Sequence, residues 1–441
     1  MKINSLSQNL YAITPQKDNR NSNNITSFRG LNLNIIKSNN VVDIFEALVK
    51  IPSPPLKEGK VAKWILDFCK SNKINARLDS YKNVKVEIPM TDATKKPILL
   101  SAHMDVVGDD SPINLVKDGD FIRTDGKRTL GADDKAGVAS ALRLAQEVVN
   151  SDIKHGGLEM LFTRDEELGM TGIMNADFNT IKSKYVLVLD EAKLGQFDNS
   201  GAGYTTVNLS VTTPYGGHSG MDIGDKKRLN AAKVISELIS KFPQGIFFKN
   251  KNGQTSINVG TIIAGDIQNS ASKIVDDGLK SEKYIDFFMA NSVTNVINTN
   301  ARATLSIRSS DINQENKLRQ KLMSIVDWFN SRYKNLAFID ISFEELMPIF
   351  EKSSDKTLEG IYKKVSKNLG LKPSIGTFPA GAETHIYCNK QNSNNERFIP
   401  ALLGIADIYN MHSPLEKISI SSLNKGYELL KQMFLNFNRA Q

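Results

Sequence analysis

Apolar residues in the first half of the chain follow two different spacings, and each spacing predicts one kind of element. Short, mainly apolar runs predict buried strands at residues 97–102, 158–163 and 185–189. Apolar residues at helical spacing predict helices at residues 41–48, 58–71 and 135–150. Because strands that alternate with helices form parallel sheets covered on both faces, we expect an α/β domain with a mostly parallel sheet.

The pattern changes at Gly203, where apolar and polar residues begin to alternate strictly. Alternation of this kind predicts strands with one face exposed to solvent. The elements expected up to residue 346 are, in order, a strand at 204–212, a helix at 229–241, strands at 256–264 and 301–308, a helix at 314–332 and a strand at 337–343. This βαββαβ order is that of a ferredoxin-like unit. We therefore predict an inserted domain at residues 203–346.

The first pattern returns after residue 346. The elements expected there are helices at 355–369 and 421–436 and an apolar strand at 398–403. The α/β domain is therefore predicted to be discontinuous, with its first part at 38–202 and its second at 347–441. Residues 1–37 are rich in Asn, Ser and Lys and contain too little apolar surface to fold, so we expect a mobile, disordered tail. Residues 266–295 receive no assignment.

Composition and charge narrow the class of protein. The net charge of +8 comes from lysines that are interleaved with acids along the chain, which predicts a solvated surface and no nucleic-acid partner. Apolar runs are too short to span a membrane, and the N-terminal residues lack the apolar segment of a secretory signal. Two isolated cysteines, Cys69 and Cys388, are typical of a reducing compartment, so we expect a cytoplasmic protein without disulfides.

Acidic residues and histidines follow the expected strands at five places. They are His103 with Asp105, Asp133, Glu166 with Glu167, Asp190, and His412. In open α/β sheets, ligands bind in the crevice at the carboxyl ends of the strands, so these side chains should converge there. Imidazole and carboxylate ligands suit Zn²⁺, and also Co²⁺ or Mn²⁺. Because the ligands are too many for one tetrahedral zinc with an open position, they suit two metal ions that share a carboxylate.

Each of these pieces, taken alone, has a simpler interpretation. A His-x-Asp sequence is often a surface coincidence, paired glutamates are often solvated, and an aspartate after a strand is often a turn residue. Their joint occurrence in this order favours a metal site. The chain has five histidines, and we interpret His155 and His385 as structural.

The ordered motifs resemble those of the zinc-dependent M20 family of exopeptidases and amidohydrolases. These motifs are His103-x-Asp105, Gly131-Ala132-Asp133-Asp134-Lys135-Ala136-Gly137, Glu166-Glu167-Leu168-Gly169, Asp190 and His412. The resemblance extends over roughly residues 40 to 440. It implies a zinc exopeptidase catalytic domain that is interrupted by a ferredoxin-like lid and dimerisation domain, and it therefore implies a homodimer.

The resemblance assigns each matched ligand to one of two zinc ions per chain. Asp133 would bridge the two ions. His103 and Asp190 would complete one site, and Glu167 and His412 would complete the other. The resemblance also implies a cis peptide bond between Asp133 and the residue that follows it.

The resemblance further implies roles in catalysis. Glu166 would be the general base that activates a metal-bridging water, and Asp105 would hold the imidazole of His103. In relatives, the histidine that His218 matches reaches the active site of the other subunit and stabilises the oxyanion. Arg308 matches an arginine that binds a substrate carboxylate. The simpler interpretations are a polar histidine in a glycine-rich turn and an exposed strand arginine.

The motifs resemble two different branches of the family, and these branches act on different substrates. Residues 163–169 resemble the aminotripeptidase branch of the family. Ala380-Gly381-Ala382-Glu383 and His412-Ser413-Pro414-Leu415-Glu416 resemble the aminoacyl-histidine dipeptidase branch instead. We therefore expect an exopeptidase of tripeptides or dipeptides. An N-acyl amino acid deacylase with the same metal centre is the alternative.

Overall fold

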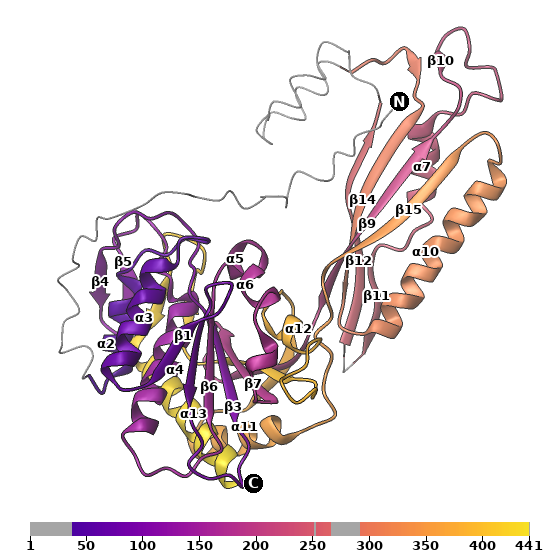
Figure 1. The fold of residues 1–441 in the computed structure, drawn as a ribbon. Coiled ribbons are helices and arrows are strands. Elements are labelled where there is room, and N and C mark those ends of the chain that lie inside the picture. Colours follow the sequence, from indigo (N-terminus) through magenta and orange to yellow (C-terminus); the bar gives the residue numbers. More distant parts are fainter. Residues whose placement is uncertain (1–37, 251–252, 266–291, 441) are drawn as a thin grey trace.

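The computed structural model describes residues 38–250, 253–265 and 292–440 (Figure 1). The predicted N-terminal tail and residues 266–291 therefore lie outside the described residues. Within the described part, the two large sheets, one of eight strands and one of five, belong to two separate bodies of the structure. The described residues also form two small sheets. One pairs β10 (Gly217–His218) with β13 (Val296–Ile297). The other contains, in spatial order, β18 (Ile408–Tyr409), β19 (Lys417–Ser419), β5 (Phe121–Thr124) and β4 (Leu115–Asp118).

The eight-stranded sheet is parallel at its centre and mixed at its edges. Its strands are, in spatial order, β1 (Asn75–Leu78), β2 (Val84–Ile88), β6 (Leu158–Thr163), β3 (Ile98–His103), β7 (Tyr185–Glu191), β17 (Ile399–Gly404), β8 (Gln196–Gly201) and β16 (Ser374–Phe378). The pairs β6–β3, β3–β7 and β7–β17 are parallel. The mixed α/β fold with a mostly parallel sheet, predicted from the sequence, is thereby confirmed.

Helices cover both faces of this sheet (Figure 1). One layer consists of α2 (Val41–Val49), α3 (Gly59–Ser71), α4 (Ala132–Val149), α11 (Thr357–Asn368) and α13 (Ile420–Arg439). The opposite layer consists of the shorter α5 (Glu166–Gly169), α6 (Thr171–Met174), η1 (Phe178–Thr180) and α12 (Thr384–Tyr387).

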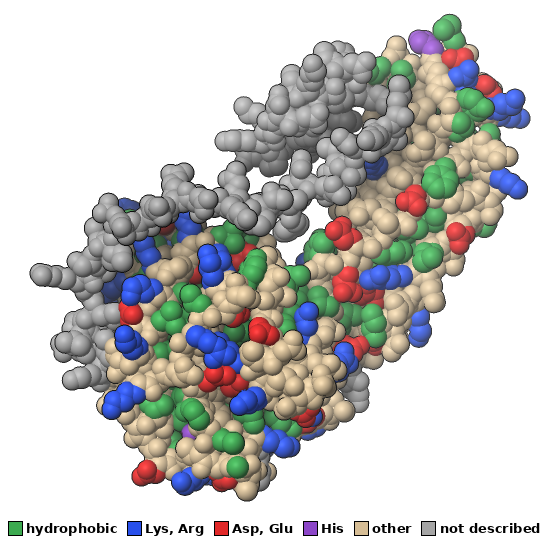
Figure 2. Space-filling model, viewed as in Figure 1, with side chains coloured by type: hydrophobic (Ala, Val, Ile, Leu, Met, Phe, Trp, Pro, Cys, Tyr) green, Lys and Arg blue, Asp and Glu red, His purple; other side chains and the backbone are tan. Residues whose placement is uncertain are grey.

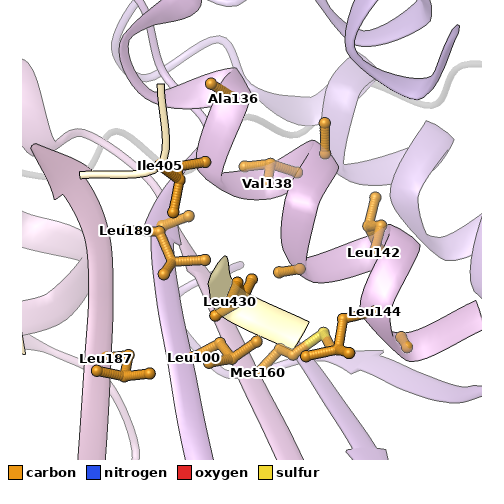
Figure 3. Packing of buried hydrophobic residues seen from close by; sticks show 14 of the residues in the cluster. Leu100, Ala136, Val138, Leu142, Leu144, Met160, Leu187, Leu189, Ile405 and Leu430 are labelled. Atoms are coloured by element: carbon orange, nitrogen blue, oxygen red, sulfur yellow. The ribbon is translucent and has the colours of Figure 1, made fainter. Parts of the chain in front are cut away.

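The central strands are apolar at most positions because their alternate residues pack into two different cores, one on each face of the sheet. Leu100, Leu187 and Leu189 pack against α4 and α13, as Figure 3 shows, whereas Leu99 and Val186 pack under the short helices. Burying one such side chain contributes about 1.5–3 kcal/mol to stability. The packing therefore fixes the sheet and, with it, the positions of the residues at the strand ends.

The five-stranded sheet is antiparallel and is covered on one face by α7 (Ala231–Ile239) and α10 (Ile312–Arg332). Its strands are, in spatial order, β11 (Gly245–Asn250), β12 (Gly253–Ala264), β14 (Asn300–Ser309), β9 (Gly203–Thr212) and β15 (Phe338–Met347). The predicted βαββαβ elements are all present, and β11 adds an edge strand. In β9, Val207, Leu209 and Val211 are buried and the residues between them are partly exposed.

The chain passes between the two large sheets at two neighbouring places. β9 begins at Gly203 directly after β8, and β15 ends at Met347. Just beyond these ends, the N–H of Gly201 donates to the carbonyl of Phe350 at 2.9 Å, which holds the two passages together. We propose them as the boundaries of the inserted domain at residues 203–346. Among the described residues, no helix combines the length and apolar character needed to cross a membrane.

Candidate metal centre

The candidate ligands lie together at the carboxyl-terminal edge of the parallel strands, as their sequence positions predict. His103 is the last residue of β3, and Asp190 is the last but one of β7. Asp133 lies in the first turn of α4, and Glu167 lies in α5. His412 comes from the loop that follows β18.

The carboxylate of Asp133 lies between two histidines. Its Oδ1 is 3.1 Å from Nε2 of His103, and its Oδ2 is 3.0 Å from Nε2 of His412. Asp190 Oδ1 lies 3.7 Å from the same His103 nitrogen, and Glu167 Oε1 lies 3.1 Å from that of His412. Two groups of three ligands result, with Asp133 in both, and the ligand atoms in each group lie within 4.8 Å of one another.

The residues present fit a pair of metal ions. Oε1 of Glu167 is buried and lies 3.1 Å from Nε2 of His412, yet it accepts no hydrogen bond from the described residues, as expected for two ligand atoms that face the same cation. Each group combines one imidazole with two carboxylates, a set that Zn²⁺ binds and that also suits Co²⁺ or Mn²⁺. The two oxygens of Asp133 face different histidines, which is the geometry that a bridging carboxylate needs.

Asp105 organises the site from behind the ligands and is itself fully buried. Nδ1 of His103 donates to the backbone carbonyl of Asp105 at 3.0 Å, so Nε2 can present its lone pair to a metal. The Asp105 carboxylate lies 3.5 Å from that Nδ1 and accepts the N–H groups of Glu166 at 2.9 Å and Glu167 at 3.0 Å. One residue therefore orients His103 and also the helix α5 that carries two further acids.

The site crowds several acids whose negative charges need positive partners. Burial raises the pKa of Glu166 to about 8 and that of Glu167 to about 7, and neighbouring carboxylates add to both shifts. Burial and the nearby Asp133 carboxylate raise the pKa of Asp190 well above its usual range. The hydrogen bond to Asp133 raises the pKa of His412 to about 9. Cations that bind here must therefore displace protons, so metal binding weakens as the pH falls.

The chain has an unusual conformation at Asp133, the residue that belongs to both ligand groups. The Asp133–Asp134 peptide bond is cis, as the family resemblance implies. Both residues lie outside helical φ/ψ values, so the regular part of α4 begins at Lys135, where the sequence predicts it. The Asp134 carboxylate accepts the N–H of Gly137 at 3.1 Å and the N–H of His103 at 3.3 Å. Asp134 thereby connects α4 to the end of β3.

His218 lies apart from the metal ligands of its own chain. It belongs to β10, which Figure 1 shows at the far end of the five-stranded sheet from α5 and β7. The side chain is exposed, and its Nδ1 accepts the N–H of Gly220 at 3.1 Å. Because Nδ1 is an acceptor, the neutral imidazole carries its proton on Nε2, where it is free to donate.

Arg308 is exposed near the end of β14. Its guanidinium lies 3.8 Å from the centre of the Tyr204 ring, a cation–π contact that holds the head group over the aromatic face. Among the described residues, Arg308 has no carboxylate within ion-pair distance. The head group is therefore available to an anion from outside the chain.

Two buried glutamates near the site received no role from the sequence. The Glu383 carboxylate accepts a hydrogen bond from the hydroxyl of Ser101 at 2.6 Å. Ser101 lies on β3, two residues before His103. Glu416 accepts backbone N–H groups at the start of α4. The sequence did contain a signal for both glutamates, because each is the last residue of a motif that resembles one in the family. His155 and His385 are buried elsewhere and belong to neither ligand group.

A protein-family model described as peptidase family M20/M25/M40 matches residues 99–436. The chain belongs to this family. It is therefore an M20-family hydrolase, and the resemblance predicted from its motifs is confirmed. Figure 2 shows lysines and arginines interspersed with acids over the face in view, as expected for an enzyme with a solvated surface.

Individual M20 relatives are distant. The cytosol non-specific dipeptidase of Escherichia coli is 28% identical over 211 residues, which cover 41% of this chain and 43% of that protein. The crystal structure of the aminopeptidase PepT from Bacillus cereus has a TM-score of 0.75 at 21% identity, covering 91% of this chain and 99% of that one. A dinuclear metal-binding M20 peptidase from Bacillus subtilis has a TM-score of 0.62 at 12% identity, covering 91% and 98%. The structural likenesses show the fold alone.

Proposed function

We propose that this M20 hydrolase is a two-metal exopeptidase that releases the N-terminal amino acid from unblocked peptides of two or three residues. The observation that carries the proposal is the Asp133 carboxylate, whose two oxygens each face a different histidine with a further acid beside it. We assign one ion to His103 with Asp190 and the other to Glu167 with His412. Zinc is the expected metal, with Co²⁺ or Mn²⁺ as substitutes.

The residues around the ligands divide the chemistry among them. When bound, two divalent cations would supply Lewis acidity that polarises the scissile carbonyl and lowers the pKa of water. Glu166 accepts the proton of the attacking water and later donates a proton to the leaving amine. The Asp105 carboxylate fixes the backbone of Glu166 and Glu167. The two neighbouring side chains can therefore keep separate roles, Glu166 as the base and Glu167 as a metal ligand.

The exposed guanidinium of Arg308 bears on the class of substrate. We infer that its guanidinium binds the free C-terminal carboxylate of a short peptide, because a planar guanidinium pairs with a carboxylate in a directional, bidentate contact. A cation at a fixed distance from the metals would limit peptide length. The dipeptidase among the relatives supports this class.

A substrate panel tests this function. Free di- and tripeptides are expected to be cleaved, and amidation of their C-terminus is expected to lower kcat/KM by at least about tenfold, the effect of losing roughly 1.4 kcal/mol. Arg308→Ala should lower kcat/KM for the free acids and abolish the difference between acid and amide. Arg302→Ala, which removes an exposed arginine from the same strand, is the matched control and should keep that difference. Turnover of N-acyl amino acids without turnover of free peptides would replace this function by the deacylase.

We also propose that the protein is a homodimer in which His218 serves the active site of the partner. The loop that follows His218 exposes Met221 at 81% and Ile223 at 65% of their surfaces, which is unusual for large apolar side chains and typical of a contact surface. The position of β10, far from the metal ligands of the same chain, supports action in trans.

Complementation between variants distinguishes action in trans from action in cis. A heterodimer of a His218→Ala chain and a Glu166→Gln chain should recover about half of the wild-type activity in trans, because one site keeps both residues. A heterodimer of the double variant with a wild-type chain should be inactive. If His218 acts within its own chain, the two heterodimers exchange these results. Activity of verified heterodimers measures the outcome directly.

A further inference from the structure

We propose that Glu416 is a positioning residue of the metal centre, which holds the backbone of Asp133 in place and ties it to the loop that carries His412. This inference rests on the two-metal centre proposed above. It gives a function to the His412-Ser413-Pro414-Leu415-Glu416 motif beyond its histidine.

The Glu416 carboxylate collects the hydrogen-bond donors at the start of α4. It is 1% exposed and accepts the N–H groups of Gly131 at 2.7 Å, Ala132 at 2.9 Å and Asp133 at 3.3 Å. The hydroxyl of Thr129 donates to the same carboxylate. Four donors on one buried carboxylate hold three successive peptide units in a single arrangement.

The start of α4 needs an external acceptor. The first N–H groups of a helix have no partner within the helix, and a capping side chain usually accepts them. Here the N-cap residue is Gly131, which has no side chain. Asp133 also lies outside helical φ/ψ values. Glu416 therefore replaces the missing cap at the residue whose side chain bridges the two ligand groups.

The same loop also carries a ligand. His412 precedes Glu416 by four residues, and the chain between them forms a tight turn in which the N–H of Glu416 donates to the carbonyl of Ser413 at 3.1 Å. The hydroxyl of Ser413 donates to the carbonyl of Asn410 at 2.7 Å. Movement of Glu416 would therefore move His412 as well. One carboxylate sets the relative positions of Asp133 and His412 through protein contacts.

Glu416→Gln separates this role from simple packing. Glutamine has nearly the same shape, but its amide nitrogen cannot accept an N–H. The variant therefore turns at least one donor–acceptor contact into a contact between two donors. A merely structural glutamate would affect folding stability and leave metal affinity unchanged.

Glu159 provides a matched control for that structural effect. Its carboxylate is 5% exposed and accepts the N–H of Ser183 at 2.7 Å and the hydroxyl of Ser183 at 2.6 Å. It also accepts the N–H of Lys182 at 3.1 Å. Glu159→Gln thus removes the same kind of buried acceptor at a place outside both ligand groups.

The experiment is a Zn²⁺ titration of metal-stripped protein in competition with a chromogenic chelator, with thermal unfolding of the metal-free proteins measured in parallel. In Glu416→Gln, the more weakly held Zn²⁺ should bind about 10–100-fold more weakly than in the wild type, the usual effect of removing an outer-shell partner. Glu159→Gln should lower Tm and leave both affinities unchanged.

The outcomes separate this inference from the function it rests on. Binding of fewer than two Zn²⁺ by the wild-type protein would refute the two-metal centre itself. Two sites in the wild type and unchanged affinities in folded Glu416→Gln would overturn the role of Glu416, as would an equal loss in Glu159→Gln. If Glu416→Gln does not fold, the same Zn²⁺ titration is carried out on Thr129→Val, which removes the hydroxyl that donates to the Glu416 carboxylate. Weaker Zn²⁺ binding in that variant supports the role, and wild-type binding overturns it.

Discussion

Replacement of Glu166 by glutamine is expected to lower kcat by about 10²–10⁴-fold while two metal ions remain bound. Glutamine preserves the shape and hydrogen-bonding length of the side chain but cannot accept the proton of the attacking water. The N–H of residue 166 still donates to Asp105, so the position of α5 should not change. The ligands of both groups are untouched.

The pH profile provides a second measurement on the same variant. Burial raises the pKa of Glu166 to about 8, and bound cations would lower that pKa because they favour the carboxylate. Wild-type kcat should therefore fall as the pH drops through the lowered pKa, since the base becomes protonated. With Zn²⁺ kept at saturating concentration, so that metal loss at low pH does not contribute, Glu166→Gln should lack this acidic limb.

A neighbouring acid supplies the control. Burial also raises the pKa of Glu191, to about 7, and this residue directly follows the candidate ligand Asp190. Glu191→Gln should keep kcat within a few-fold of the wild type and retain the acidic limb. Near-normal turnover by Glu166→Gln, or an equal loss in Glu191→Gln, would mean that the base has been assigned to the wrong residue.

The centre of the fold was predictable because its strands are buried on both faces. β3, β6 and β7 are buried strands made mainly of apolar residues, with Glu159 as the acidic exception in β6, so the sequence alone marks them. β8 has no such signal, because Phe197 is its single large apolar residue. Its strand conformation depends on pairing with β17 and β16, which are distant in sequence. Local patterns carry no information about that pairing.

The same distinction applies to the candidate site. The ligands were predictable because each follows a recognisable strand or occurs in a family motif. The contact between Glu416 and the backbone of Asp133 joins residues 283 positions apart, so only the folded chain shows it. His218 was predictable as a motif, but its distance from the ligands depends on how the five-stranded sheet is placed.

Removal of the Asp133 carboxylate, the proposed bridge, is expected to have an even larger effect than removal of Glu166, the proposed base. Asp133→Ala leaves two protein ligands in each group: His103 with Asp190, and Glu167 with His412. A catalytic zinc site normally needs three protein ligands, so neither group should retain its ion. Metal content measured after gel filtration should fall from close to two ions per chain to near zero, and peptidase activity should fall to background.

His412→Ala is the matched comparison, because this ligand belongs to one group. It leaves the group of His103, Asp133 and Asp190 complete, so metal content should fall to about one ion per chain. Unequal losses in the two variants would follow directly from the position of Asp133 between the histidines. Retention of two ions by Asp133→Ala would show that the ions do not share this carboxylate. Equal loss in both variants would show that the ions bind as one inseparable unit, with His412 as necessary as the bridge.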